Sequence, residues 1–139
     1  MSTNSLITNF DRTKVFLGEN TYQSDNYVNG TSYDPITLVK GTVMGRISAS
    51  GNLTPVIQGA NNGADKPIGI LAEDYEIDAG VTKQVTICDK GEVAESEIVF
   101  WDGVLTLNTV LSGQRYRDHL TYLGIKLRGG TEMTSLDNQ

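Results

Sequence analysis

The sequence predicts a small, mainly β domain that carries one short C-terminal helix and follows an extended N-terminal arm. Short apolar runs separated by glycine-containing turns recur between residues 36 and 101, which is typical of β-strands. Further along, the apolar spacing changes to that of a helix. The length of 139 residues suits a single domain. We therefore expect a barrel-like or sandwich-like arrangement of short strands.

The first 34 residues are predicted to form the arm, because Asn, Ser, Thr, Asp and Gly dominate them. A segment of this kind has too little apolar surface to offset the entropy that it loses on ordering alone, but it can order against a partner. The composition changes at Pro35. We place the arm at residues 1–34, the β domain at 35–130 and a polar tail at 131–139.

Within the β domain, apolar runs predict strands at residues 36–39, 41–48, 53–57, 67–72 and 81–89. Pro55 weakens the third of these strands, because proline cannot donate to a β-ladder. The tripeptide Asp89-Lys90-Gly91 suits the tip of a hairpin, from which residues 92–101 return.

The predicted helix rests on Tyr116, Leu120 and Leu123, which follow the i, i+4, i+7 spacing of one helical face. Thr109 or Ser112 is expected to cap its start. Gly124 stands where a helix-ending glycine belongs, and residues 125–127 are then a short strand.

The charge of the chain argues against two classes of partner. The formal net charge is -6 and the pI is near 4.6, whereas nucleic-acid binders usually carry a strongly basic face. The same sign disfavours anionic membranes, and there is no apolar run of the length that spans a bilayer. The N-terminus has no signal-peptide pattern and Cys88 is the single cysteine, so we expect synthesis in the cytoplasm without an intrachain disulfide.

No catalytic or metal-binding pattern is present. His119 is the only histidine and falls beside the apolar face of the predicted helix, and Cys88 is expected to be a structural thiol. The acidic cluster Glu73, Asp74, Glu76 and Asp78 lacks the spacing of a calcium loop and is interpreted as a solvated strand end or loop. The segment 59–63 lacks the lysine of a phosphate loop. We expect no enzyme activity, cofactor or metal.

Two patterns leave alternatives open. Lys90 is either part of a plain turn or the modified lysine of a carrier domain of the lipoyl or biotinyl kind. Four basic residues fall within fourteen positions, and they form either a solvated face or a contact with an acidic partner surface. These residues are Arg115, Arg117, Lys126 and Arg128.

Three segments, taken in order, resemble the head decoration protein D family of lambda-like tailed bacteriophages. They are Pro67-Ile68-Gly69-Ile70-Leu71-Ala72, then Lys90-Gly91-Glu92-Val93 leading to Ile98-Val99-Phe100-Trp101, and last the helix through Leu120 and Leu123 into Gly124-Ile125-Lys126-Leu127. The resemblance covers about residues 35–128, with residues 36–53 fitting the first strands. Two features depart from the family: the arm is longer, and Asp102 follows Trp101 where a proline is expected.

The resemblance implies a compact β domain of the β-tulip type and a non-enzymatic capsid decoration, or cement, protein. Such proteins form trimers on the outer surface of the expanded phage head, which they stabilise, and their N-terminal arm docks on the major capsid protein. It therefore implies three things here: a homotrimer, the major capsid protein as partner, and a place on the outside of the virion after synthesis in the host bacterium.

Candidate site residues follow from this resemblance and from the apolar pattern. We expect the arm to bind by strand addition, with Phe10, Val15, Phe16 and Leu17 as capsid-binding anchors. The large apolar residues Phe100, Trp101, Tyr116 and Leu120 are expected to lie in the core or in the trimer interface. The alternative function is a phage surface adhesin that binds a glycan or receptor through exposed aromatic residues, for which Tyr22, Tyr27 and Tyr33 are candidates.

Overall fold

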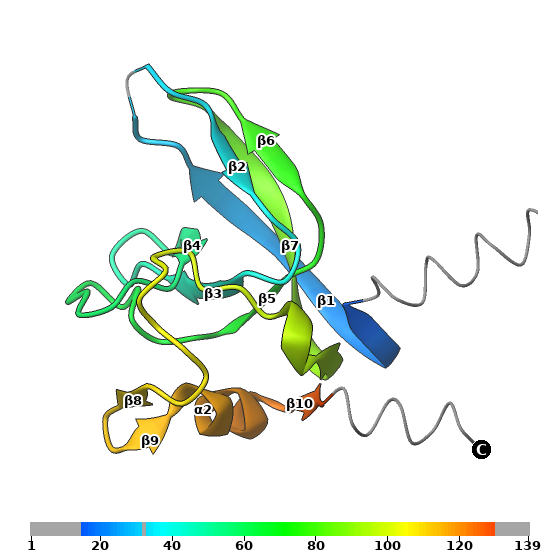
Figure 1. The fold of residues 1–139 in the computed structure, drawn as a ribbon. Coiled ribbons are helices and arrows are strands. Elements are labelled where there is room, and N and C mark those ends of the chain that lie inside the picture. The colour runs from blue at the N-terminus through cyan, green and yellow to red at the C-terminus, as the bar shows by residue number, and fades with distance from the viewer. Residues whose placement is uncertain (1–14, 32, 130–139) are drawn as a thin grey trace, which may run out of the picture.

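The computed structural model describes residues 15–31 and 33–129, arranged as Figure 1 shows. The strands are β1 (Phe16–Val28), β2 (Ile36–Leu38), β3 (Val43–Arg46), β4 (Leu53–Pro55), β5 (Gly69–Leu71), β6 (Tyr75–Ile77), β7 (Thr82–Ala94), β8 (Val110–Leu111), β9 (Gln114–Arg115) and β10 (Ile125–Arg128). A 3-10 turn, η1 (Glu95–Glu97), follows β7, and the α-helix α2 (Tyr116–Leu123) precedes β10.

The main sheet is built around β7. Its strand order is β1-β7-β5-β3-β4, with every neighbouring pair antiparallel, and β10 pairs with β7 in parallel. β2 and β6 form one separate pair, and β8 and β9 form another. The mainly β fold with one C-terminal helix is thus confirmed, with open sheets and no closed barrel in the part of the chain that the structure describes.

Two clusters of buried side chains hold the fold together, and β7 contributes to both. Ile87 belongs to the cluster under β2, β4 and β6, whereas its neighbour Cys88 belongs to the cluster under α2 and β10. Successive residues of a strand point to opposite faces, so this one strand divides the domain into an upper and a lower part. In Figure 1, β2 and β6 lie above β3, β4 and β5, while α2, β8, β9 and β10 lie below them.

The expected arm needs a correction, because residues 16–28 form β1 and belong to the main sheet. β1 pairs with β7 from Phe16, opposite Val93, to Val28, opposite Thr82. Backbone hydrogen bonds hold an edge strand in place even when most of its side chains are polar and exposed. The boundary expected at Pro35 therefore lies inside the fold, and residues 1–14, which complete the expected arm, lie outside the described residues.

The hairpin expected at Asp89-Lys90-Gly91 is also corrected, because all three residues lie within β7. The pairing of β1 with β7 is irregular between Leu17 and Tyr22, and Gly91 lies opposite this irregularity. Its φ of 140° suits glycine, and a Cβ there would collide with the side chain of Asn20. Asn20 also exchanges two hydrogen bonds with the backbone of Glu92, of 3.1 and 3.2 Å. Glycine at position 91 thus leaves room for the Asn20 side chain, whose hydrogen bonds replace part of the backbone pairing between β1 and β7.

The C-terminal prediction is confirmed in its main features. Tyr116 and Leu120 are buried on one face of α2, Gly124 ends the helix with a φ of 98°, and β10 follows. The expected cap is wrong, because Arg115 occupies the N-cap position without a side-chain hydrogen bond. Thr109 lies outside the helix, and its hydroxyl accepts a bond of 2.9 Å from the Thr106 amide.

Three smaller features of the strands remain to be compared with the prediction: the proline in β4, the strand β6 and the hairpin of β8 and β9. β4 is the last strand of the main sheet, and an edge position tolerates Pro55. β6 was not predicted, although Tyr75 and Ile77 turn toward the upper core while Glu76 between them is exposed. The β8–β9 hairpin was also missed, and its turn places both Ser112 and Gly113 at positive φ.

Candidate functional site

The start of β1 and the end of β10 lie at the same end of the main sheet. Val93 of β7 pairs with Phe16 on one side and with Leu127 on the other. An ion pair fixes this end, since Arg128 Nε lies 2.7 Å from Glu92 Oε1. The start of β1 and the end of β10 therefore lie on the same side of the domain, the right-hand side of Figure 1.

The four expected capsid-binding residues fall into different environments. Val15 is 5% exposed and belongs to the lower core, and Phe16 packs against that core. Leu17 is half-buried within the β1–β7 pairing. Phe10 lies outside the described residues. In the single chain, therefore, Val15 is part of the lower core.

The four residues expected in the core or the trimer interface also separate. Tyr116 and Leu120 are buried in the lower core, with exposures of 1% and 0%. Phe100 packs against this core and meets the Tyr116 ring edge-on, with ring centroids 5.5 Å apart. Trp101 belongs to neither buried cluster and is 41% exposed. The expectation of core or trimer interface covered all four residues alike, whereas in the structure three of them belong to or pack against the core and Trp101 is at the surface.

Asp102 joins two loops that lie far apart in the sequence. Its Oδ2 accepts a hydrogen bond of 3.0 Å from the Gln58 amide, and its Oδ1 accepts bonds of 3.0 and 3.1 Å from the Val104 and Leu105 amides. Partial burial alone would raise the pKa of Asp102, but these backbone hydrogen bonds outweigh it and hold the pKa below its ordinary value. The aspartate that departs from the family's expected proline is thus a structural clamp.

This clamp predicts a pH dependence. Because the pKa of Asp102 is lower in the folded chain than in the unfolded chain, its contribution to stability is present above about pH 4 and is lost as the pH falls through the folded value. Asp102→Asn should therefore lose less stability than the wild type between pH 7 and pH 3. Urea unfolding at both pH values measures this, with the exposed Asp78→Asn as the control. Equal losses in wild type and Asp102→Asn would contradict the clamp.

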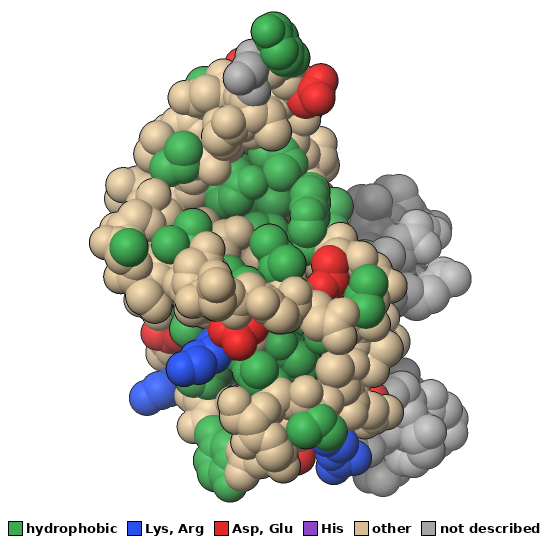
Figure 2. Space-filling model, turned by 90° about the vertical axis from the view of Figure 1, so that its left-hand side faces the viewer, with side chains coloured by type: hydrophobic (Ala, Val, Ile, Leu, Met, Phe, Trp, Pro, Cys, Tyr) green, Lys and Arg blue, Asp and Glu red, His purple; other side chains and the backbone are tan. Residues whose placement is uncertain are grey.

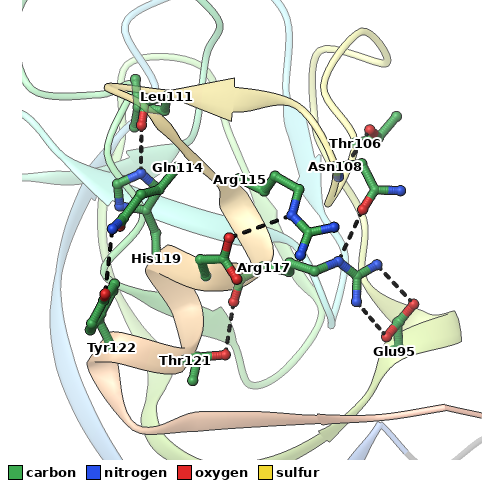
Figure 3. Close-up of polar contacts among 11 residues, drawn as sticks. Glu95, Thr106, Asn108, Leu111, Gln114, Arg115, Arg117, His119, Thr121 and Tyr122 are labelled. Atoms are coloured by element: carbon green, nitrogen blue, oxygen red, sulfur yellow. Dashed lines mark hydrogen bonds and ion pairs between the residues drawn. The ribbon is translucent and has the colours of Figure 1, made fainter.

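The basic cluster is largely engaged within the chain itself. Arg117 forms a two-point ion pair with Glu95, with both contacts at 3.2 Å, and its Nε donates a bond of 3.0 Å to Asn108 (Figure 3). Arg115 pairs with Asp118 at 3.4 Å, and Arg128 pairs with Glu92. These contacts favour the interpretation of a structural network over a free basic surface that awaits an acidic partner.

Replacing Arg117 should loosen the contact between α2, η1 and the loop before β8. Its side chain is 28% exposed, so we expect Arg117→Ala to lower the free energy of unfolding by about 1–2 kcal/mol. The matched control is Arg115→Ala, whose side chain is 51% exposed and whose loss should cost less than about 0.5 kcal/mol. Chemical unfolding compares the two variants, and equal effects would refute the special role of Arg117.

Within the described part of the chain, the remaining titratable groups form no recognisable reaction centre. His119 Nε2 lies 2.7 Å from the Leu111 carbonyl oxygen, so its ring ties α2 to β8. Burial raises the pKa of the Cys88 thiol, which keeps it protonated and unreactive. Among residues 15–31 and 33–129, no group of three His, Cys, Asp or Glu side chains could hold a metal ion. None of the helices there combines the length and apolarity needed to cross a membrane.

The three tyrosines of the alternative function do not form a shared surface. Tyr27 is 8% exposed and belongs to the upper core, whereas Tyr33 is 90% exposed and Tyr22 is 49% exposed. Tyr22 and Tyr27 lie on the same strand about 17 Å apart, at roughly 3.4 Å per residue. A glycan platform would need adjacent exposed rings.

The comparison with known families agrees with this picture. Residues 16–111 match the family described as bacteriophage lambda head decoration protein D, and they include all of β1 through β8. No curated protein sequence matches the chain. Proteins of this family are structural components of the capsid surface and not enzymes. Because the match covers well over half of the 139 residues, the chain belongs to the bacteriophage lambda head decoration protein D family and is a capsid decoration protein that stabilises the phage head.

Proposed function

We propose that the protein decorates the expanded head as a homotrimer and docks on the major capsid protein through the residues that precede β1, by strand addition. The observation that carries this proposal is the position of β1. It is an edge strand of the main sheet, and the first 14 residues lead directly into it. A chain that continues such a strand in extended form can pair with an exposed sheet edge on another protein.

Phe10 is the main apolar anchor of this segment, and the accessible parts of Phe16 and Leu17, the first two residues of β1, support it. Val15 attaches this segment to the domain, because its side chain is buried and its carbonyl oxygen accepts a hydrogen bond of 2.8 Å from the Ala94 amide. Ordering the segment costs about 1–2 kcal/mol per residue, so a single copy binds weakly. Three linked copies on one trimer gain roughly 10²–10⁴ in avidity.

Preference for the expanded head needs only that the docking sites exist, or are correctly spaced, in the expanded lattice. Binding to one state and not to the other then stabilises that state by mass action.

Deleting residues 1–14 should abolish binding to expanded shells and leave the trimer folded, because the deletion stops before the buried Val15. The measurement is co-sedimentation with the parent phage's shells before and after expansion, together with analytical ultracentrifugation of the free protein. The control deletion removes residues 131–139 and should retain binding. A protein without residues 1–14 that still decorates expanded shells would disprove arm docking.

The adhesin function remains as the competing proposal only through Tyr33, whose 90% exposure is unusual for an aromatic side chain. A glycan array with the free protein tests it. Binding that Tyr33→Ala removes would favour an adhesin, whereas the absence of any glycan binding would leave decoration alone.

A further inference from the structure

Three exposed apolar side chains lie on the two loops that Asp102 joins. Val104 is 60% exposed, and Trp101 and Ile57 are each 41% exposed. Trp101 precedes Asp102, Val104 donates its amide to that carboxylate, and Ile57 precedes the residue whose amide binds the other carboxylate oxygen. The three residues, named here the Trp101 surface, therefore lie on backbone segments that the Asp102 carboxylate holds together, although Ile57 lies more than 40 positions away in the sequence.

The Trp101 surface is fixed before any partner arrives. The Gly103 amide donates a bond of 3.2 Å to the Phe100 carbonyl, and the Asp102 carboxylate holds three further amides. Phe100 in turn is anchored against buried Tyr116. A contact surface that is already ordered loses little entropy on binding, and tryptophan is among the residues that most often dominate interface energies.

The size of the Trp101 surface suits part of a protein interface. From its exposures, it leaves roughly 200 Å² of apolar surface open to water. A stable interface buries about 800 Å² on each partner, a little over half of it apolar, so this cluster alone supplies close to half of the apolar share. That is more than isolated surface residues provide, and it needs surrounding polar contacts to complete an interface.

The Trp101 surface lies away from the start of β1, where the proposed docking segment joins the domain. In Figure 1, the chain from η1 to β8 passes beside β4 on the left, whereas the start of β1 and the end of β10 lie on the right. Figure 2 shows that left-hand side, where hydrophobic side chains gather in two hollows and a band of Lys, Arg, Asp and Glu side chains lies between them. An apolar area bordered by charged side chains matches the arrangement of a subunit interface, which has an apolar centre and a polar rim.

We propose that the Trp101 surface is where a second copy of the chain packs in the trimer. This inference rests on the trimer of the proposed function. In a threefold ring each contact is heterologous, so the Trp101 surface of one copy meets a different surface of the next. Trp101 is then protected in the free trimer, before any shell is present.

The test uses Trp101 itself, because it is the only tryptophan of the chain and its fluorescence reports one site. The full-length protein is compared with Val104→Asp, which places a charge in the proposed contact at a position that is already 60% exposed in the single chain. We expect the variant to need at least about a tenfold higher concentration for half-assembly in sedimentation equilibrium. Acrylamide should quench Trp101 at least about twofold more strongly in the dissociated variant than in the wild-type trimer.

The matched control is Val81→Asp, which makes the same substitution at an exposed valine just before β7 and should remain trimeric. Ile57→Ser is a second variant should circular dichroism show Val104→Asp to be unfolded. If Val104→Asp or Ile57→Ser is folded and still trimeric, the assignment of this surface is wrong, although the trimer itself stands. Dissociation of Val81→Asp to the same extent would also contradict the assignment. If the wild type is monomeric, both this assignment and the proposed trimer are wrong. If Trp101 becomes protected from acrylamide only when shells are added, the surface binds the capsid protein instead.

Discussion

Replacing Tyr116 by alanine should lower the free energy of unfolding by about 3–5 kcal/mol, the range found when a large buried aromatic ring is removed. The ring is 1% exposed, packs edge-on against Phe100 and closes the lower core under α2. Its hydroxyl donates a hydrogen bond of 2.6 Å to the Asp65 carbonyl, which ties the helix to the loop before β5. Burial raises the pKa of this hydroxyl, so it stays protonated as a donor at neutral pH.

Two further variants separate the ring from its hydroxyl. Tyr116→Phe keeps the packing and should cost about 1–2 kcal/mol, the loss of one hydrogen bond to a partly buried carbonyl. Tyr122→Ala removes the other tyrosine of α2, which is 75% exposed, and should cost less than about 0.5 kcal/mol. Urea unfolding of the three proteins gives the comparison. A loss below about 1 kcal/mol for Tyr116→Ala would show that this ring is not central to the core.

Gly41→Ala should destabilise the domain by about 2–4 kcal/mol, combining backbone strain with a steric clash. Gly41 adopts a φ of 98°, and a Cβ there would collide with the backbone carbonyl oxygen of Glu97. That collision cannot be relieved by rotating a side chain. The Gly41 carbonyl also accepts a bond of 3.0 Å from the Val99 amide, so the two segments cannot separate without losing their pairing.

Gly51→Ala is the control that isolates the clash. Gly51 also has a positive φ, 79°, but a Cβ there would meet no atom within 4 Å. We therefore expect Gly51→Ala to cost about 1 kcal/mol from strain alone. Thermal and chemical unfolding should rank Gly41→Ala well below Gly51→Ala, and equal stabilities would mean that the contact with Glu97 yields easily.

The parts of the fold that the sequence predicts are those where burial shapes the residue pattern. The apolar face of α2 and its terminal glycine are visible because Tyr116 and Leu120 must be buried and the chain must then turn. Most of β2, β3, β4, β5 and the first part of β7 were found for the same reason.

β1 was missed because its stability comes from the ladder with β7, and backbone hydrogen bonds leave no apolar signature. Only Tyr27 of its thirteen residues is buried. The sequence held one signal for β1. It consists of the β-favouring residues Thr21, Tyr22, Tyr27 and Val28, with Asn29-Gly30 directly after them. Buried Asn29 confirms the end of the strand, since its side-chain amide donates bonds of 3.0 Å to the carbonyls of Asp34 and Ile77.

The site shows a different limit of sequence reasoning. Nothing in the linear pattern distinguishes Trp101 from Phe100 or Tyr116, because all three are large aromatic residues near the same helix. Their separation depends on Asp102, which binds a residue 44 positions away and turns the chain there. A clamp between distant loops has no local signature, so the exposed surface beside it emerges only in three dimensions.

The pairing of β1 with β7 also has a consequence for how the chain folds during synthesis. Val28 meets Thr82 and Phe16 meets Val93, so the first strand of the sheet cannot begin to pair until more than 80 residues have been made and cannot finish until more than 90 have been made. β10 then joins the same stretch of β7. Contacts of this separation slow folding, because the long intervening loop must close first. During this wait β1 exists as an unpaired strand. Its Asn, Ser, Thr, Asp and Glu side chains are a poor template for association with other nascent chains. The polarity that conceals this strand in the sequence thus protects the polypeptide from aggregation until β7 emerges.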